Sequence, residues 1–206
     1  MKRKTKTRRW VQAHARDPFV RQAKTQGWRS RAVFKLEEID QRDRLLKPGM
    51  TVVELGAAPG GWTQYVRHSL GHGGQVIAVD VLPMEAVAGV EFIQGDFCEQ
   101  EILDRLMAAI GGKPVDLVIS DMAPNMTGVN AVDQPRAMFL AELVLDFAAQ
   151  TLRPGGDMLV KVFQGEGFDA YMKNMRASFE KVASRKPKAS KDRSRELYLL
   201  ARNYAL

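Results

Sequence analysis

One short stretch constrains the fold of this chain more than any other. Residues 51–55 (Thr-Val-Val-Glu-Leu) are mostly apolar and β-branched, which favours a buried strand. The Gly-Ala-Ala-Pro-Gly-Gly run at residues 56–61 predicts a tight turn, and a helix is expected from Trp62 to about Leu70. A turn of this kind, after the carboxyl end of a parallel strand, is where doubly wound sheets bind nucleotide-like ligands.

The spacing of the glycines excludes two common phosphate-binding turns. It does not match the Gly-x-Gly-x-x-Gly dinucleotide pattern, and no Gly-Lys-Ser/Thr of a P-loop follows. Glu54 lies two residues before the turn, where its carboxylate can accept hydrogen bonds from an amine. This position indicates the amino-acid end of S-adenosylmethionine as ligand. The alternative is an ordinary strand–turn–helix whose glycines serve only the turn.

Three further strands are expected to end beside this turn. They are predicted at residues 75–80, 90–94 and 115–120. Each ends at or just before an aspartate, and the carboxyl ends of parallel strands meet at one edge of a sheet. Asp80 is therefore placed to accept both ribose hydroxyls of a nucleoside, and Asp96 to meet the exocyclic amine of an adenine. Asp121 falls near the reactive part of such a ligand, with a plain turn acid as the alternative.

The remaining segments alternate between helices and strands. We expect helices at residues 18–25, 31–44, 99–110, 134–152 and 168–178, and strands at 157–163, 179–184 and 196–201. Asp17 before Pro18 is a helix-start signal, and Ser30 is expected to cap the second helix. A mobile loop is expected at 127–133 and a turn at 153–156. The pattern predicts an α/β fold with a mostly parallel seven-stranded sheet, helices on both faces and a final antiparallel pair.

Lys161 is the least expected residue of the pattern. It interrupts the apolar strand 157–163, which should lie centrally in the sheet. A desolvated lysine costs free energy unless it is paired, so its presence there favours a functional role. The alternative is a lysine at the edge of the sheet that extends its amine to water.

Composition limits the class of protein and its chemistry. The chain has 206 residues and no apolar run near the roughly 20 residues of a membrane span, so we expect no membrane partner. The charged N-terminus has no apolar signal-peptide segment, and the single cysteine, Cys98, allows no internal disulfide. We therefore expect a cytoplasmic monomer, with Cys98 as a small core residue. The three histidines lack metal-ligand spacing, and no metal site is expected.

Charge is segregated along the chain. Residues 1–31 hold 11 Lys/Arg against Asp17 alone, whereas residues 32–180 hold 12 basic and 21 acidic residues. Residues 181–195 are basic again, with seven Lys/Arg against Asp192. Basic ends around an acidic middle indicate a polyanionic partner, because a merely solvated surface mixes the two signs.

The N-terminal basic residues are interleaved with aromatic ones. These are Trp10, Phe19 and Trp28. Such side chains suit stacking on nucleobases, so residues 1–30 are predicted to be an RNA-binding arm and residues 31–206 the catalytic domain. Residues 1–17 are expected to be flexible until a partner binds. The alternative is a solubilising tail with a few buried aromatics.

Four motifs in order give the chain a family resemblance. They are LGAAPGGW at 55–62, SDMAPN at 120–125, VKVF at 160–163 and SRELY at 194–198. Together with GWRSRA at 27–32, they make the chain resemble the FtsJ/RlmE family of ribosomal RNA 2′-O-ribose methyltransferases over almost its whole length. The resemblance implies a Rossmann-like class I S-adenosylmethionine-dependent methyltransferase fold.

The resemblance also implies the site residues. The family's Lys–Asp–Lys–Glu catalytic tetrad matches Lys35, Asp121, Lys161 and Glu196. Its S-adenosylmethionine contacts match Gly60, Trp62, Asp80, Asp96 and Asp121. Glu54 departs from the aspartate of many relatives. The implied substrate is a uridine in the A-loop of 23S rRNA, in the large ribosomal subunit or its precursor, and the implied role is support of ribosome assembly.

The residue types agree with ribose methylation. A 2′-hydroxyl is a poor acid, and a lysine can act as its base when burial and a neighbouring cation favour the neutral amine. Lys161 is the candidate base, with Lys35 as the neighbouring cation and a ligand for the substrate phosphate. Asp121 and Glu196 would orient the lysines, and water taking the proton is the alternative.

Two other functions fit parts of the pattern. A base or protein methyltransferase could use the same fold, although adenine N-methylation favours an aromatic residue after the Asn/Asp-Pro-Pro turn and residues 121–124 lack it. An RNA-binding assembly factor could keep the cofactor pocket for structure alone, and it would tolerate loss of Lys161.

Overall fold

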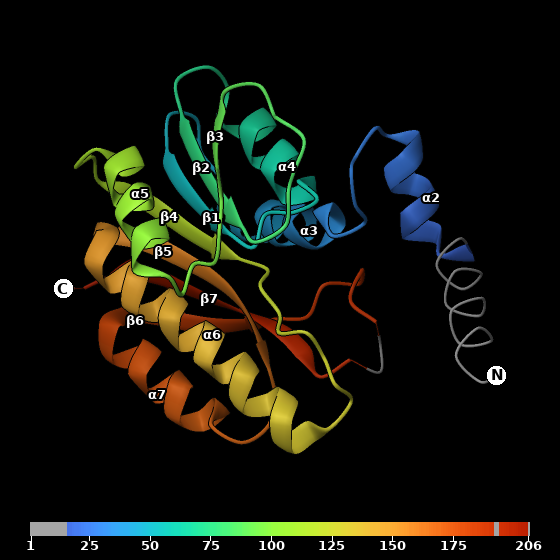
Figure 1. Ribbon diagram of the computed structural model, residues 1–206, viewed down its shortest axis with the longest axis vertical. Helices are drawn as coiled ribbons and strands as arrows, with labels where there is room; N and C mark the ends of the chain where they lie inside the picture. Colours follow the sequence, from blue (N-terminus) through green and yellow to red (C-terminus); the bar gives the residue numbers. More distant parts are fainter. Residues whose placement is uncertain (1–15, 192–193, 206) are drawn as a thin grey trace.

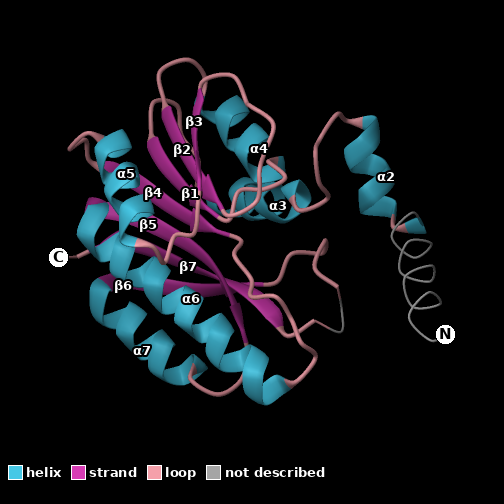
Figure 2. Cartoon of the chain, viewed as in Figure 1, coloured by secondary structure: helices cyan, strands magenta, loops and turns pink. Residues whose placement is uncertain are grey.

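The computed structural model describes residues 16–191 and 194–205, and these form a mixed seven-stranded sheet between two layers of helices (Figures 1 and 2). The strands are β1 (Thr51–Leu55), β2 (Gln75–Asp80), β3 (Val90–Gln94), β4 (Val115–Ser120), β5 (Leu152–Phe163), β6 (Phe179–Arg185) and β7 (Glu196–Tyr204). The helices are α2 (Pro18–Thr25), α3 (Val33–Asp43), α4 (Gly61–Leu70), α5 (Gln100–Ile110), α6 (Asn130–Thr151) and α7 (Phe168–Ser178).

The strands follow the order β3-β2-β1-β4-β5-β7-β6. Strands β1 to β5 are parallel, and β7 is antiparallel to both β5 and β6, as predicted. The order reverses between β1 and β4. Ligands of open α/β sheets bind at such a switch point, outside the carboxyl ends of the strands, so the fold places a binding site beside the glycine turn.

Two apolar clusters hold the layers together, because alternate side chains of a strand point to opposite faces. Val53 and Leu55 point into a cluster with the buried faces of α5, α6 and α7. Val52 points to the other face, where Leu36 of α3 and Val66 of α4 lie. The expected helices on both faces are therefore confirmed, and Figure 1 shows α5, α6 and α7 together on one of them.

Segment 16–32 packs on the domain. Asp17 caps α2 as predicted, accepting a hydrogen bond from the main-chain N–H of Phe19 at 2.9 Å. Phe19 packs on Phe34 and Trp28 on Tyr65, with ring centroids 5.7 and 6.2 Å apart. These two aromatics, expected to stack on bases, thus contact their own chain. Most of the segment expected to be flexible, residues 1–15 with Trp10, lies outside the described residues.

The predicted cap of α3 is wrong. The helix begins at Val33 after Ala32, with no side-chain hydrogen bond at its cap, and the Ser30 carbonyl accepts from the Val33 N–H at 3.3 Å. Ser30 Oγ instead lies against the glycine turn, where a β-carbon added to Gly61 would come within 2.4 Å of it. Close packing of two chain segments therefore replaces the local cap.

Two predicted loops are also shorter than expected. Helix α6 begins at Asn130 instead of residue 134, because the Asp133 carboxylate accepts hydrogen bonds from the loop before the helix. Residues 153–156, expected as a turn, belong to β5, which pairs with β4 through a register shift between Val115 and Leu117. Tertiary pairing extends both elements into sequence that is typical of turns.

No helix in the described ranges is long and apolar enough to span a bilayer.

An ion pair joins the end of α3 to the end of β6. Arg185 Nε and Nη2 donate to Asp43 Oδ2 and Oδ1, both at 2.7 Å, and both side chains are largely buried. The hydrogen bonds from Arg185 lower the pKa of Asp43 despite the opposing effect of burial. A lowered folded-state pKa means that the pair stabilises the fold above about pH 4, the unfolded-state value, and less as pH falls below it.

We predict that Asp43→Asn lowers the free energy of unfolding by about 1–3 kcal/mol near pH 7. The difference from the parent protein should stay constant down to about pH 4 and shrink below it, because the parent carboxyl then takes up a proton. Urea denaturation across this pH range measures it. A difference that persists unchanged at pH 3 would show that the Asp43 charge is not what stabilises the contact.

Candidate active site

A cleft of about 480 Å³ lies at the switch point of the sheet. Its walls are the ends of β1 to β4, the loops that follow them and one residue of α6: Gly56, Ala58, Val79, Asp80, Val81, Leu82, Gly95, Asp96, Phe97, Cys98, Asp121, Met122, Ala123, Pro124, Asn125 and Leu140. All the charged residues of this lining are aspartates. An acidic cleft of this size suits a cationic, nucleoside-like ligand and disfavours a phosphate.

The glycine turn lets the loops approach one another. The N–H groups of Gly56 and Ala57 both donate to the Val79 carbonyl, at 2.9 and 3.1 Å, which fastens the turn to β2. Gly56 has φ +84°, and an added β-carbon would lie 2.6 Å from the Met122 side chain and 3.0 Å from its main-chain nitrogen. A larger residue would therefore push apart the loops after β1 and β4 and distort the cleft.

Gly60 and Trp62, both predicted cofactor contacts, do not line the cleft. A β-carbon on Gly60 would meet Arg29 and Met84, so this glycine packs against the N-terminal segment. The Trp62 ring is buried under Tyr198, with centroids 5.6 Å apart, and its indole N–H donates to the Ala32 carbonyl at 2.7 Å. A cofactor contact from either residue would have to use its main chain, and both remain predictions.

Asp80 and Asp96 hold their carboxylates at the cleft by local hydrogen bonds. Asp80 accepts from the N–H groups of Ala58 and Leu82, both at 2.8 Å, and Asp96 accepts from Cys98 N–H at 2.9 Å. Each bond fixes one rotamer and leaves further acceptor capacity free for a ligand.

Cys98 is exposed at the wall of this cleft, so its prediction as a core residue is wrong. Phe97 takes the inward position beside it and packs edge-on against Phe147, with centroids 5.5 Å apart. Partial burial of the thiol, helped by the Asp96 carboxylate, raises the pKa of Cys98 to about 11. The thiol is therefore protonated at neutral pH and a weak nucleophile.

Glu54 lies behind the turn, almost completely buried at 1% exposure. Its Oε2 atom has no hydrogen-bond partner among the described residues. Burial, with the charges of Asp121 and Asp80, raises the pKa of Glu54 to about 8, against a smaller opposing hydrogen bond from Thr63. An unpartnered buried acceptor beside the cleft fits the amine-bearing ligand that the sequence indicates.

The four residues of the predicted tetrad come together from four elements as two ion pairs. Lys161 Nζ lies 3.1 Å from Asp121 Oδ1 and also donates to the Asp121 carbonyl. Lys35 Nζ lies 2.7 Å from Glu196 Oε1. The Lys161 side chain is only 8% exposed, which rules out the alternative of an edge lysine extended into water.

Tyr198 joins the two pairs, and the sequence analysis missed it. It lies opposite Lys161 in the β5–β7 register and is fully buried. Its hydroxyl donates to Asp121 Oδ1 at 2.6 Å, and Lys35 Nζ lies over its ring, 5.7 Å from the centroid. In the sequence, Tyr198 is one residue of a mostly apolar strand. Only its position two residues after Glu196 could have indicated that it belongs to the site.

The electrostatics of Glu196 follow from the pairing. Burial alone would raise the pKa of Glu196, but the charge and hydrogen bond of Lys35, with the charge of Lys161, outweigh it and lower the pKa. Glu196 is therefore an anion at neutral pH.

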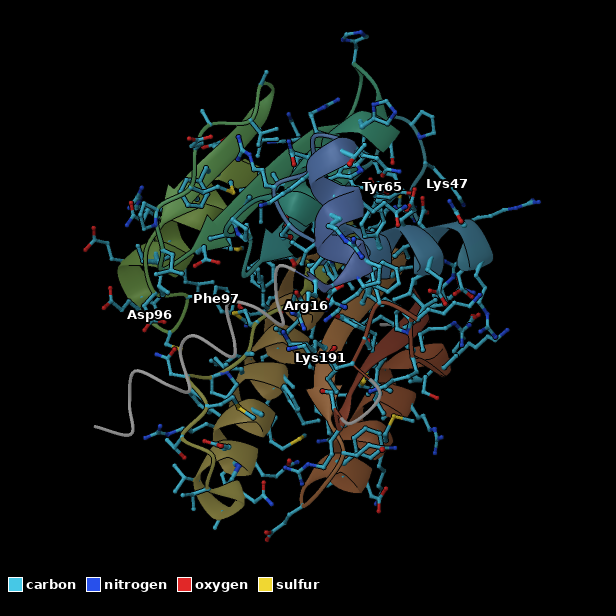
Figure 3. All side chains as sticks on the ribbon, turned by 90° about the vertical axis from the view of Figure 1, so that its right-hand side faces the viewer. Arg16, Lys47, Tyr65, Asp96, Phe97 and Lys191 are labelled. Atoms are coloured by element: carbon cyan, nitrogen blue, oxygen red, sulfur yellow. The ribbon has the colours of Figure 1, made fainter. Side chains whose placement is uncertain are left out.

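A basic recess of about 230 Å³ adjoins the Lys35–Glu196 pair, lined by Arg31, Ala32, Lys35, Ala189, Lys191, Ser194 and Glu196. Arg31 fixes this region, because it pairs with Asp17 and donates to the Ala189 carbonyl. Lys191 and Arg16 are both labelled on the face turned to the viewer in Figure 3. The catalytic pairs thus stand between an acidic cleft and a basic recess.

A larger open groove, of about 690 Å³, lies beside α4 and is lined by Trp28, Gln64, Arg67, His68, Gly71, His72, Val87, Ala88 and Gly89. None of the predicted catalytic or cofactor residues faces it. The predicted site therefore lies at the smaller cleft and not at this groove.

The fold and the site define an α/β protein with an acidic cleft at the switch point of its sheet and a buried lysine–aspartate pair beside it. The FtsJ-like methyltransferase family matches residues 28–204. The chain belongs to this family.

Similarity to individual proteins agrees with this family assignment. Ribosomal RNA large subunit methyltransferase E of Alkalilimnicola ehrlichii is 59% identical over 100% of this chain and 98% of its own length. The protein of the same name from Pseudomonas aeruginosa is 58% identical over 99% of each chain. The crystal structure of a ribosomal RNA methyltransferase from Plasmodium falciparum superposes with a TM-score of 0.78 at 27% identity, covering 86% of this chain and 98% of that one.

Glu54 gives a test of the site that needs no ligand. Its pKa is about 8 in the folded protein and 4.5 in the reference state, so the folded protein binds the extra proton between these values. The free energy of unfolding should therefore fall as pH rises through this range. Glu54→Gln cannot titrate and should lack this loss. We predict that the stability of the variant relative to the parent increases from pH 5 to pH 8, measured by urea denaturation; parallel pH curves would contradict it.

Proposed function

We propose that this protein transfers a methyl group from S-adenosylmethionine to the ribose 2′-hydroxyl of a uridine in the A-loop of 23S rRNA. The observation that carries the proposal is the Lys161–Asp121 pair, buried between the acidic cleft and the basic recess. The two relatives above bear the name of a large-subunit ribosomal RNA methyltransferase at 58–59% identity over nearly their full length, which supports the choice of substrate.

The cleft fits S-adenosylmethionine, whose sulfonium and amino groups are cationic. Asp80 would accept the ribose hydroxyls, Asp96 the adenine amine, and Asp121 would lie toward the methyl group. Gly60 and Trp62 would contribute main-chain contacts only, since a β-carbon on Gly60 and the Trp62 ring both point at other parts of the protein and not into the cleft. The buried Oε2 of Glu54 supports an amine in this cleft, because the amino group would supply the partner that it lacks.

The bound cofactor supplies an electrophilic methyl group, and the protein's own residues prepare the acceptor. Lys161 takes the proton of the 2′-hydroxyl at Nζ, and Asp121 orients that amine through its carboxylate and carbonyl. Tyr198 fixes the Asp121 carboxylate. Lys35, oriented by Glu196, holds the acceptor phosphate at the basic recess. Positioning in this way supplies much of the rate enhancement expected for an in-line transfer.

The substrate would be the RNA of the large ribosomal subunit or its precursor, met in the cytoplasm by a monomer. The arm 1–30 and the basic residues of 181–195 would supply affinity for the RNA backbone, and residues 31–206 the chemistry. Methylation would support assembly of the subunit. Mass mapping of ribose methylation in rRNA from cells with and without the protein tests the proposal; identical maps would exclude it.

The cofactor assignment has its own test. Asp80→Ala should weaken S-adenosylmethionine binding by about 1.5–3 kcal/mol, the range for hydrogen bonds to a charged acceptor. Isothermal titration calorimetry measures this directly. Because Asp80 also holds the Ala58 N–H, thermal unfolding of the variant should be compared as a control. An intact protein that binds no S-adenosylmethionine would rule out a methyltransferase.

Substitutions of Lys161 test its assignment as the catalytic base. Lys161→Ala should abolish methylation while cofactor binding persists. Only a neutral amine can accept the proton of the hydroxyl. Lys161→Arg keeps the charge but stays protonated, so it should be as inactive as the alanine variant. A Lys161→Arg enzyme with near-normal turnover would assign the proton to water and leave Lys161 a positioning cation.

A further inference from the structure

The loop that follows β4 faces two ways. We name residues 122–129 the rim loop. Its first half, Met122 to Asn125, lines the cofactor cleft. Its second half carries Met126 and Val129, which are 53% and 54% exposed. The rim loop therefore runs from the reactive centre at Asp121 out to the surface.

The exposed apolar side chains of this loop are available for contact with a partner. Met126 and Val129 are among the few large apolar residues that are more than half exposed in the described chain, and they follow a catalytic aspartate within eight residues. One cation lies beside the end of the rim loop, at the residue next to Val129 in the chain. Arg195 reaches the start of α6, where its Nη2 donates to Asn130 Oδ1 at 2.9 Å, and the basic recess adjoins Glu196, the next residue. Apolar contacts beside cations match a nucleotide, which combines a flat base with an anionic backbone.

Hydrogen bonds to Asp133 hold the rim loop in one conformation. Asp133, 2% exposed, accepts from Thr127 N–H and Oγ1 at 2.8 Å each and from Gly128 N–H at 2.9 Å. The Thr127 hydroxyl in turn accepts from Val129 N–H at 3.1 Å. One buried carboxylate thus fixes the three residues between the exposed methionine and α6.

Gln134, the residue after Asp133, connects the start of α6 to the end of β5. Gln134 Nε2 donates to the carbonyls of Phe163 and Glu166 at 3.1 and 3.0 Å. Phe163 ends β5, two residues after Lys161. The first turn of α6 therefore sets the position of the rim loop relative to the strand that carries the catalytic lysine.

We propose that the rim loop is a contact surface for the acceptor RNA, with Met126 and Val129 packing against a nucleobase at the target nucleotide, and that Asp133 is the positioning residue that holds it. The inference rests on the proposed function. Ribose methylation needs only the sugar at the catalytic pairs, so the base must be accommodated outside them. The rim loop supplies an apolar surface at that place without reading the base by hydrogen bonds.

Steady-state methyl transfer to large ribosomal subunits that lack the modification tests the proposal. The double variant Met126→Ser/Val129→Ser should raise KM for the subunits about five- to tenfold, the effect of losing about 1–1.4 kcal/mol of contact. Its kcat should stay within about twofold, and its S-adenosylmethionine affinity should not change. Met107→Ser is the matched control, since Met107 is a 41% exposed methionine on α5 and should leave KM unaltered.

Asp133→Asn should raise the same KM, because one acceptor oxygen becomes a donor facing an N–H. Combining it with the double variant should give little further effect, since the changes act through one surface. Should Asp133→Asn fail to fold, the Met126→Ser/Val129→Ser protein decides alone. A KM equal to that of the Met107→Ser control overturns the inference while the proposed function stands. Absence of rRNA methylation by the parent protein would instead overturn the proposed function.

Discussion

The Asp121 carboxylate is the contact on which the site depends. It ends the strand next to the glycine turn, and its Oδ1 atom takes both the Lys161 ammonium at 3.1 Å and the Tyr198 hydroxyl at 2.6 Å. Buried charges are tolerated only when they are paired and hydrogen-bonded. Removing Asp121 would leave Lys161, 8% exposed, without its anion. The central sheet can therefore carry a lysine because Asp121, just after the neighbouring β4, pairs with it and is itself held by Tyr198 of β7.

The geometry of that contact follows from the reversed last strand. Strand β7 is antiparallel to β5, and its register places Tyr198 opposite Lys161 and Glu196 opposite Phe163. A parallel β7 would bring its amino end to the far edge of the sheet. The antiparallel connection instead brings Glu196, and the basic segment before it, to the edge where β1 and β4 end. Lys35 reaches the same place from α3, so the Lys35–Glu196 pair joins an early helix to the last strand.

Acidic and basic residues are also separated at the site, in the cleft and in the basic recess. The aspartates of the cleft suit a cationic cofactor, and the lysines and arginines of the recess suit an RNA backbone. A cofactor and an acceptor of opposite charge can then meet at Lys161 and Asp121 without sharing a surface. The first half of the rim loop lines the cleft, and its second half is held by Asp133.

The secondary-structure elements and the candidate site residues could be predicted from the sequence. Apolar periodicity located the seven strands, because a strand buried on both faces is apolar throughout. Aspartates at strand ends could be placed at one edge because parallel strands all point the same way. The family motifs supplied Lys35 and Glu196, which nothing in their local sequence distinguishes from a surface lysine and a strand-end acid.

Other contacts depend on how side chains pack in the folded chain, which no local pattern specifies. Ser30 packs on a glycine instead of capping a helix, Cys98 is turned outward because Phe97 takes the inward place, and α6 starts early because Asp133 binds the preceding loop. Tyr198 is a site residue only through its register with Lys161. Local sequence specifies propensity, but which of two satisfactory partners a polar group takes depends on what the fold brings beside it.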